Sequence, residues 1–218
     1  MILAITNQKG GAGKTTLSLN LAGYWALQGK KVKLLDMDKQ QSAMDWMRIR
    51  THQELPELFE LKAYSDESLV QHISEESKDF DIVILDTPPQ VEALARAAAC
   101  SAQLIIIPLR PSAVDLMAAH ATVELLERAA EAVDIDFRFC LTQYSVGTIV
   151  GREAKRTLVH DYEDVETFET MIGHRKDFVE AFGQGQCIHE YAPTSQAAFE
   201  IYSVAKEVDA WFEAFLTL

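Results

Sequence analysis

A glycine-rich segment near the start of the chain, residues 7–16, constrains the fold more than any other stretch. It reads NQKGGAGKTT and lies between a short apolar run (residues 1–6) and an amphipathic stretch (residues 17–27), the order of a strand, a loop and a helix. Glycines let successive backbone N–H groups turn inward around phosphate oxygens, and the positive end of the helix dipole adds to that attraction. An ordinary glycine-rich turn is the alternative, but it does not require a Lys-Thr pair at the start of the helix. The segment therefore predicts a phosphate-binding loop.

The side chains of this loop indicate a nucleotide with its magnesium ion. Lys14 should reach the β- and γ-phosphates, and the Thr15 hydroxyl should coordinate Mg²⁺. The predicted nucleotide-binding residues of the loop are Lys9, Gly10, Gly11, Ala12, Gly13, Lys14, Thr15 and Thr16.

The loop departs from the general pattern G-x-x-x-x-G-K-[ST] at its first position. Gln8 stands where that glycine is expected, and Lys9 directly precedes the Gly-Gly pair. This K-G-G-x-G-K-T-T form resembles the deviant Walker A motif of the ParA/MinD family of ATPases. In that family the early lysine crosses a dimer interface and contacts the phosphates of the partner's nucleotide. The resemblance implies ATP and Mg²⁺ as cofactors, and a nucleotide-dependent homodimer in which Lys9 acts in trans.

Two aspartates follow the second predicted strand, residues 32–36. The strand ends in Asp36, and the next residues, MDKQQ, complete a segment that resembles the family's D-x-D-P-Q, with Lys39 where proline is usual. In relatives the second aspartate orients the attacking water, a role that the resemblance gives to Asp38. By themselves the two aspartates also fit a polar turn. Beside a phosphate loop they favour a site, because ligands of open α/β sheets bind at the carboxyl ends of the strands.

The segment DIVILDTPP, residues 81–89, is a second strong signal. An apolar run that ends in aspartate is the pattern of a buried strand that delivers one carboxylate towards Mg²⁺. Such runs are common in parallel sheets, but downstream of a phosphate loop the pattern is specific. We expect Asp86 to act on the metal through water, and Thr87-Pro88-Pro89 to form a switch that senses the γ-phosphate.

Apolar strands alternate with helices along the chain, which predicts an α/β fold with a doubly wound, mainly parallel sheet flanked by helices. With 218 residues, the chain fits a single domain over residues 1–218. Capping boxes beginning at Ser42 and Ser112 mark two helix starts. The final predicted helix, residues 195–216, has an aromatic stripe that should pack on the sheet, and its acidic residues should be repelled by an anionic membrane.

Bulk composition excludes several classes of protein. No apolar run approaches the ~18 residues of a membrane-spanning helix, and the chain begins directly with a strand, so we expect no signal peptide. Cys100, Cys140 and Cys187 are widely separated and match neither a disulfide framework nor a metal motif. Together with the phosphate loop, they indicate a reduced, cytoplasmic location.

The charge balance complicates any interaction with DNA. Twenty Lys and Arg residues against thirty-three Asp and Glu give a net charge of −13, which repels polyanions at long range. Salt screens this repulsion beyond ~8 Å, so a local basic patch can still bind. Arg152, Lys155 and Arg156 form the densest basic cluster. In ParA-like proteins, basic residues in the carboxyl half contact DNA phosphates non-specifically. A solvated helix face is an equally good interpretation of the three residues.

The resemblance extends over nearly the whole chain. Arg175, Phe178, Ala181 and Gly185 match the family's R-x-x-F-x-x-A-x-x-x-G stretch. In relatives the loop before the last helix lies near the adenine, which makes Pro193 a candidate base contact. No helix-turn-helix region precedes the first strand, as in the short ParA-like proteins without a specific DNA-reading domain.

The resemblance implies a slow ATPase that works as a dimerising switch. The dimer would bind nucleoid DNA non-specifically and position a cargo such as a plasmid, a chromosome region or a large protein assembly, with hydrolysis stimulated by a partner protein. Lys9, Lys14 and Asp38 would act in catalysis, and Thr15 and Asp86 would hold Mg²⁺. The alternatives are a membrane-associated division-site regulator like MinD, disfavoured by the acidic final helix, and an iron–sulfur or nitrogenase-reductase-like ATPase, disfavoured by the cysteine spacing.

Overall fold

A six-stranded sheet runs through the centre of the protein. The computed structural model describes residues 1–64, 68–145 and 148–217, without the side chains of Ile149, Val150 and Arg152. The strand order is β3-β2-β4-β1-β5-β6, and every neighbouring pair is parallel. The strands are β1 (Ile2–Ile5), β2 (Val32–Asp36), β3 (Glu60–Ala63), β4 (Ile82–Asp86), β5 (Leu104–Leu109) and β6 (Asp136–Leu141).

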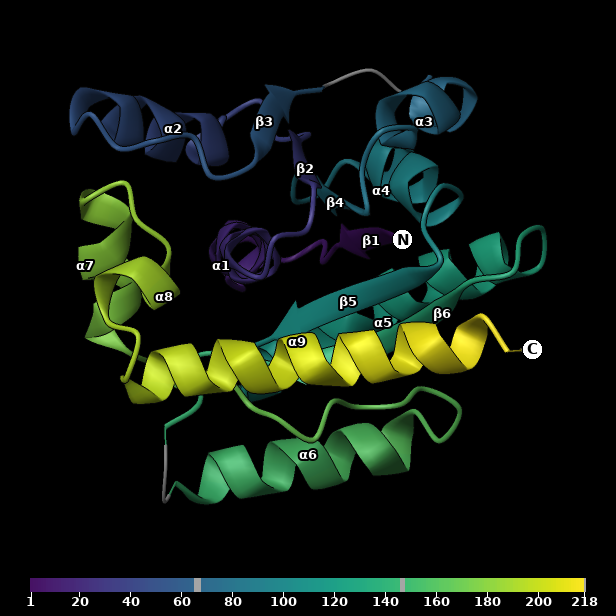
Figure 1. Cartoon of the computed structure of the whole chain (residues 1–218). Coiled ribbons are helices and arrows are strands. Elements are labelled where there is room, and N and C mark those ends of the chain that lie inside the picture. Colours follow the sequence, from purple (N-terminus) through teal and green to yellow (C-terminus); the bar gives the residue numbers. More distant parts are fainter. Residues whose placement is uncertain (65–67, 146–147, 218) are drawn as a thin grey trace.

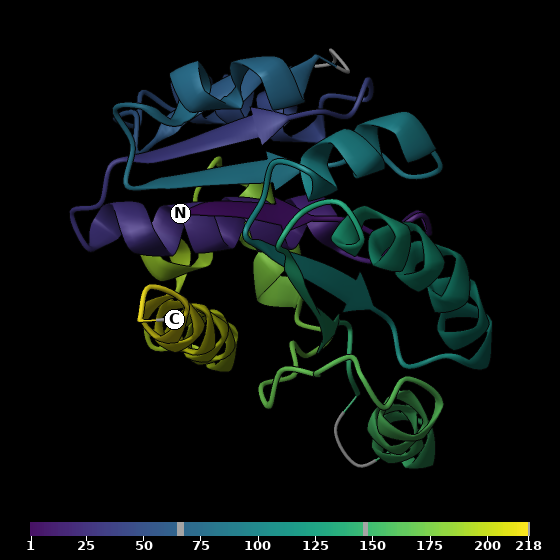
Figure 2. The ribbon, with the colours of Figure 1, turned by 90° about the vertical axis from the view of Figure 1, so that its right-hand side faces the viewer.

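Helices cover both faces of the sheet, as Figures 1 and 2 show. One face packs against α1 (Lys14–Leu27), α2 (Ser42–His52), α7 (Lys176–Gly183), α8 (Ile188–Tyr191) and α9 (Gln196–Phe215). The other packs against α3 (Leu69–Ser77), α4 (Glu92–Ala99), α5 (Ala113–Ala130) and α6 (Ile149–Asp161). The predicted doubly wound α/β fold is confirmed.

The central strands are buried along their whole length. Every residue of β2, β4 and β5 is buried, which explains why these strands are mainly apolar in sequence; Lys33 in β2 is a buried exception. At the outer edge of β6, residues 166–174 run alongside the strand: the Phe139 N–H donates to the Glu166 carbonyl and the Ile172 N–H to the Leu141 carbonyl. This segment covers an edge that would otherwise expose unpaired backbone groups.

Local signals predicted the helix ends with mixed success. The Ser112 hydroxyl caps α5 by accepting from the Asp115 N–H, as predicted. At α2 the helix begins at Ser42, as predicted, but the predicted capping box does not form: Ser42 is the first helical residue and Gln41 before it makes no side-chain cap. The prediction that the aromatic stripe of α9 packs on the sheet was also only partly right. The helix buries its aliphatic side chains, whereas Phe199 and Tyr202 are exposed.

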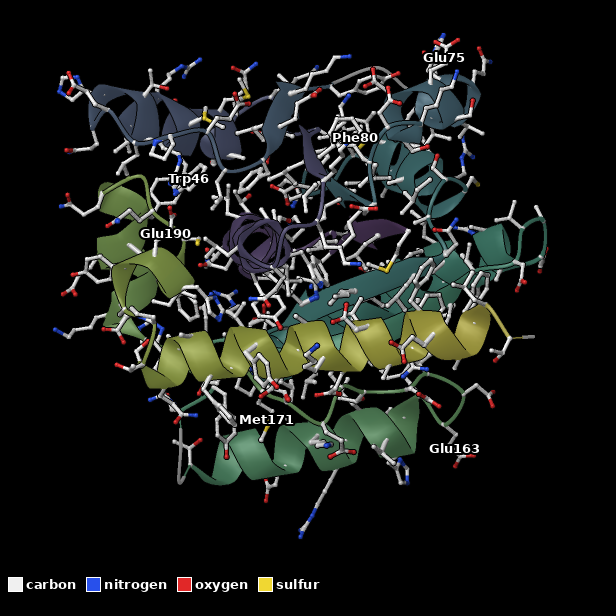
Figure 3. The ribbon with its side chains drawn as sticks, viewed as in Figure 1. Trp46, Glu75, Phe80, Glu163, Met171 and Glu190 are labelled. Carbon is white, nitrogen blue, oxygen red and sulfur yellow. The ribbon has the colours of Figure 1, made fainter. Side chains whose placement is uncertain are left out.

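A buried ion pair joins α2 to α8. Arg50, whose side chain is 1% exposed, donates to both carboxylate oxygens of Glu190 at 2.8 and 2.9 Å and to the Gly185 carbonyl. Gly185 has a φ of 64°, and a Cβ there would lie 2.4 Å from the Arg50 nitrogen, so only glycine fits. Figure 3 shows Glu190 near Trp46, whose ring lies under the guanidinium of Arg50.

Removing the carboxylate of this pair should destabilise the fold. Glu190→Gln leaves the Arg50 charge buried without a counter-ion, which costs about 3–5 kcal/mol. Urea unfolding at neutral pH measures the loss. Burial is the largest single influence and would raise the pKa of Glu190, but the hydrogen bonds and charge of Arg50 together with the hydrogen bonds from Cys187 lower that pKa below its ordinary value of 4.5. The contribution is therefore complete above pH 4.5 and disappears as the pH falls through the folded-state pKa.

Asp45→Asn on the same helix is the matched control, because Asp45 pairs with Arg48 at the exposed surface. It should cost less than about 1 kcal/mol. Equal losses for the two variants would contradict a structural role for the Arg50–Glu190 pair.

Candidate nucleotide-binding site

The carboxyl ends of the strands open into a cavity of about 450 Å³ above the glycine-rich loop. It brings the loop together with the predicted Asp38 and with Pro89 from the segment after β4. On its far side it is closed by α7. The lining residues are Gly10, Gly11, Ala12, Gly13, Lys14, Thr15, Thr16, Asp38, Ser42, Pro89, Phe178, Val179 and Phe182.

The loop has the backbone shape that its glycines predict. Gly11 and Gly13 have φ values of 74° and 85°, and α1 begins directly after Gly13. The amino end of α1 therefore faces the cavity, where an anion would meet its dipole and free N–H groups. Lys14 is buried, with its ammonium donating to the Asn7 and Lys9 carbonyls at 3.1 and 3.3 Å. Burial lowers the pKa of Lys14, and the nearby carboxylates of Asp86 and Asp38 oppose that shift.

Three polar side chains that the sequence did not single out hold the loop from behind. Asn7 is fully buried; its amide donates to the Pro108 carbonyl at 2.7 Å and its oxygen accepts from the Lys9 N–H. Thr142 and Gln143, at the end of β6, donate to carbonyls of the loop at 2.8 and 2.7 Å. No local pattern marks these residues, because their loop contacts depend on how β1, β5 and β6 lie side by side.

Asp36 shapes the turn that carries Asp38. Its carboxylate accepts from the N–H groups of Asp38, Ala43 and Met44, so it caps α2 from the end of β2. Burial raises the pKa of Asp36, and these three backbone donors oppose the rise. Asp38 lines the cavity and accepts from the Gln40 N–H, while Lys39 is exposed. Nothing in the structure explains the lysine at this position.

Asp86 lies beside Asp36 in the β2–β4 register and is almost fully buried. One carboxylate oxygen accepts from the Ser18 hydroxyl at 3.1 Å. The other is buried and has no hydrogen-bond partner among the described residues. Burial raises the pKa of this carboxyl to about 7, and the nearby Thr15 hydroxyl opposes the rise. An unsatisfied oxygen beside a threonine hydroxyl fits the hard oxygen ligands that Mg²⁺ takes, directly or through water.

A smaller cavity of about 190 Å³ continues from the loop towards β6. It shares Gly13, Thr16, Phe178 and Val179 with the larger cavity and is lined further by residues that include Gln143 and Arg175. Its position beyond the phosphate loop suits the nucleoside half of a nucleotide.

The candidate base contact Pro193 lies elsewhere. It lines a separate cavity with Tyr24 and Gln28, at the opposite end of α1. Tyr24 follows Lys14 by ten residues, which places it about 15 Å along the helix from the loop. The expectation for Pro193 is corrected accordingly: the residues at the loop that can meet a base come from the end of β6 and from the segment before α7.

The predicted DNA-binding cluster lies on α6, and one of its three basic side chains is already paired with a carboxylate. Lys155 forms an ion pair with Glu169 at 2.7 Å, whereas Arg156 is exposed. The side chain of Arg152 is outside the described residues.

Cys140 and Cys187 are buried, and burial raises the pKa of each thiol to about 12. Across the described ranges, no cluster of three His, Cys, Asp or Glu residues is arranged to hold a metal ion, and no helix is long and apolar enough to cross a membrane.

Comparison with known proteins agrees with this geometry. The chain is 27% identical to the chromosome-partitioning ATPase Soj of Thermus thermophilus, covering 95% of each chain. It is 31% identical to the maintenance of carboxysome distribution protein A of Gloeobacter kilaueensis, covering 95% of this chain and 94% of that one. The solved structure of MinD with Mg-ADP from Pyrococcus horikoshii has the same fold, with a TM-score of 0.76, 20% identity and 95% of each chain covered.

The family model of the CobQ/CobB/MinD/ParA nucleotide binding domain matches residues 3–186, a span that includes the phosphate loop, Asp38 and Asp86. The chain therefore belongs to the ParA/MinD family of P-loop ATPases.

Proposed function

We propose that this protein is an ATP-dependent switch that partitions or positions a large cargo. The observation that carries the proposal is the convergence of the phosphate loop and Asp38 around one cavity, with the buried carboxylate of Asp86 beside Thr15 of that loop. Each subunit binds ATP with Mg²⁺, and two subunits pair across their nucleotides. Hydrolysis then separates them; it is slow in the protein alone and is stimulated by a partner protein.

Most of the catalytic work is positioning and charge neutralisation, as is usual for phosphoryl transfer. Lys14 stabilises charge on the phosphates from within the loop. Lys9 does so on the partner's nucleotide; its side chain is only half-buried and forms no ion pair within the described part of the chain. Thr15 and Asp86 hold Mg²⁺, which neutralises phosphate charge when bound. Asp38 orients the attacking water.

The names of the relatives indicate the general kind of cargo but not its identity. The names of two relatives refer to chromosome partitioning and to carboxysome distribution. For this chain we propose a cytoplasmic homodimer that binds nucleoid DNA non-specifically and moves a plasmid, a chromosome region or a protein assembly. Arg152, Lys155 and Arg156 are the proposed contacts to DNA phosphates.

Two alternatives within the family are less well supported. A MinD-like regulator would need to associate with membranes, whereas α9 carries four acidic residues against one lysine. An iron–sulfur ATPase would need accessible cysteines that can meet across a dimer axis, whereas Cys140 and Cys187 are buried in the subunit. Pelleting with anionic vesicles and the visible absorption spectrum test these alternatives directly.

Lys14→Ala should abolish ATP binding, because it removes the buried cation of the phosphate loop. Isothermal titration with Mg·ATP measures the affinity, and Lys31→Ala, an exposed lysine outside the site, is the control. Unchanged affinity in Lys14→Ala would contradict the assignment of the loop.

Asp38→Ala should bind ATP with nearly unchanged affinity but hydrolyse it at least about tenfold more slowly, a barrier increase of about 1.4 kcal/mol. The variant should accumulate as an ATP-bound dimer, which sedimentation measures. Asp45→Ala, seven residues later on the exposed side of α2, should behave like the wild type. Undiminished turnover in Asp38→Ala would remove this residue from the mechanism.

Binding to non-specific duplex DNA should require ATP and weaken steeply with salt. We expect no binding with ADP or without nucleotide, as measured by fluorescence anisotropy across a salt series. Replacing Arg152, Lys155 and Arg156 by alanine should abolish binding, whereas alanine at the exposed Lys30, Lys31 and Lys78 removes the same charge without this effect. ATP-dependent dimerisation without DNA binding would exclude the nucleoid as the matrix.

A further inference from the structure

A large hollow lies between α5 and α6, on the face of the sheet opposite α1 and α9. Its volume is about 720 Å³, and it shares no lining residue with the two cavities at the phosphate loop. Figure 2 shows the two helices neighbouring each other at the lower right of the molecule. We call this hollow the α5–α6 groove. Its lining residues are Ala113, Leu116, Met117, His120, Glu153, Ala154, Thr157, Asp161 and Tyr162.

The groove is built from one stripe of each helix. On α5 the stripe follows helical spacing through Ala113, Met117 and His120, and on α6 it follows Glu153, Thr157 and Asp161. Each stripe covers about two turns, or 11–12 Å of helix axis. A groove of this length between two helices has the shape that accepts a third helix of a few turns.

One wall of the groove is apolar and open to solvent. The side chain of Met117 is 80% exposed and that of the neighbouring Val114 is 64% exposed, although both lie on a helix whose opposite side is in the core. Methionine has a flexible, polarisable side chain that adapts to different apolar partners. An exposed apolar surface beside a hollow is typical of a site for another protein.

The other wall is acidic. Glu153 and Asp161 are both exposed, and their positions on α6 lie eight residues, or about 12 Å, apart along the helix axis. His160 lies 3.0 Å from one oxygen of Asp161. Carboxylates at both ends of the groove repel DNA phosphates and anionic lipids from the groove itself, whose lining does not include the proposed DNA contacts of α6. They also repel a second copy of this chain that would present the same groove.

We propose that the α5–α6 groove docks a basic amphipathic helix of a partner protein. The apolar stripe of that helix contacts Leu116 and Met117, and two Lys or Arg residues, seven or eight positions apart, pair with Glu153 and Asp161. This inference deepens the proposed function, because it assigns a docking surface to the partner that sets the rate of hydrolysis.

The groove is physically connected to the phosphate loop through α5. The Gln8 N–H donates to the Thr122 hydroxyl at 3.3 Å, and the Gln8 amide donates to the Ala121 carbonyl at 3.4 Å. At the amino end of α5, Asp115 accepts two hydrogen bonds from Arg110. A nitrogen of the Arg110 guanidinium would lie 3.8 Å from a Cβ at Gly11. A helix that displaces α5 therefore acts on the segment before the loop through the Gln8 hydrogen bonds, with the Arg110 guanidinium close to Gly11 as a neighbour.

The test uses a panel of fluorescent peptides of about 15 residues, long enough to form a helix. Each peptide carries a Leu/Met stripe flanked by two lysines seven or eight residues apart. The full-length protein with ATP should bind at least one of them. Met117→Asn and Glu153→Lys/Asp161→Lys should each weaken binding by about tenfold or more, and the loss from the charge variant should be larger at low salt. A charge-swapped peptide with glutamates should bind the lysine variant and not the wild type.

Matched controls come from α3, on a distant surface. Figure 3 shows Glu75, on α3, far from Glu163, which follows α6. Glu75→Lys/Asp79→Lys makes the same change in net charge at exposed positions, and Val70→Asn removes an exposed apolar side chain. Equal weakening by the α3 and groove variants would overturn the proposal, as would a wild type that binds no peptide of the panel. A change in self-association caused by Met117→Asn would assign the groove to a second copy of the chain and overturn it too.

ATP binding measured on the same samples separates two failures. A chain that binds ATP but none of the peptides contradicts the groove alone. A chain that binds no ATP contradicts the proposed function, on which this inference rests.

Discussion

The site depends on two carboxylates placed side by side at the ends of β2 and β4. Asp36 and Asp86 are both almost fully buried, where like charges repel strongly and each charge loses its hydration. The chain stabilises them in different ways. Asp36 accepts three backbone N–H groups and so fixes the turn that carries Asp38, whereas Asp86 keeps one oxygen without a partner in the described structure. The remaining negative charge calls for a cation, and Lys14 and a magnesium ion are the cations that the loop can bring there.

The sequence predicted the parts that local signals encode. Strand and helix periodicity predicted the parallel sheet, because strands covered on both faces are mainly apolar along their length. The loop and the aspartates after β2 and β4 were found because parallel strands bring their carboxyl ends to one edge. This rule of topology predicts that the separate motifs meet at one cavity, and it requires no knowledge of side-chain contacts.

What the sequence did not predict depends on contacts between distant segments. Asn7 bonds to Pro108 and Arg50 to Glu190 across more than a hundred residues, and no spacing within either segment marks them. The cap of α2 comes from the preceding strand, so a local capping box at Ser42 was misleading. Pro193 was assigned from the resemblance alone, whereas in this structure it lines a cavity at the far end of α1.

The central position of β1 also affects when the protein can fold during synthesis. β1 is the first strand to leave the ribosome, yet its neighbours β4 and β5 pair with it through residues such as Val83 and Leu104. At about 5–20 residues per second, the strand waits several seconds for those partners. The phosphate loop, held by side chains from β6, takes its final shape later still. Nucleotide binding therefore cannot assist the early steps of folding, and a nascent chain becomes competent for ATP only when most of it has been made.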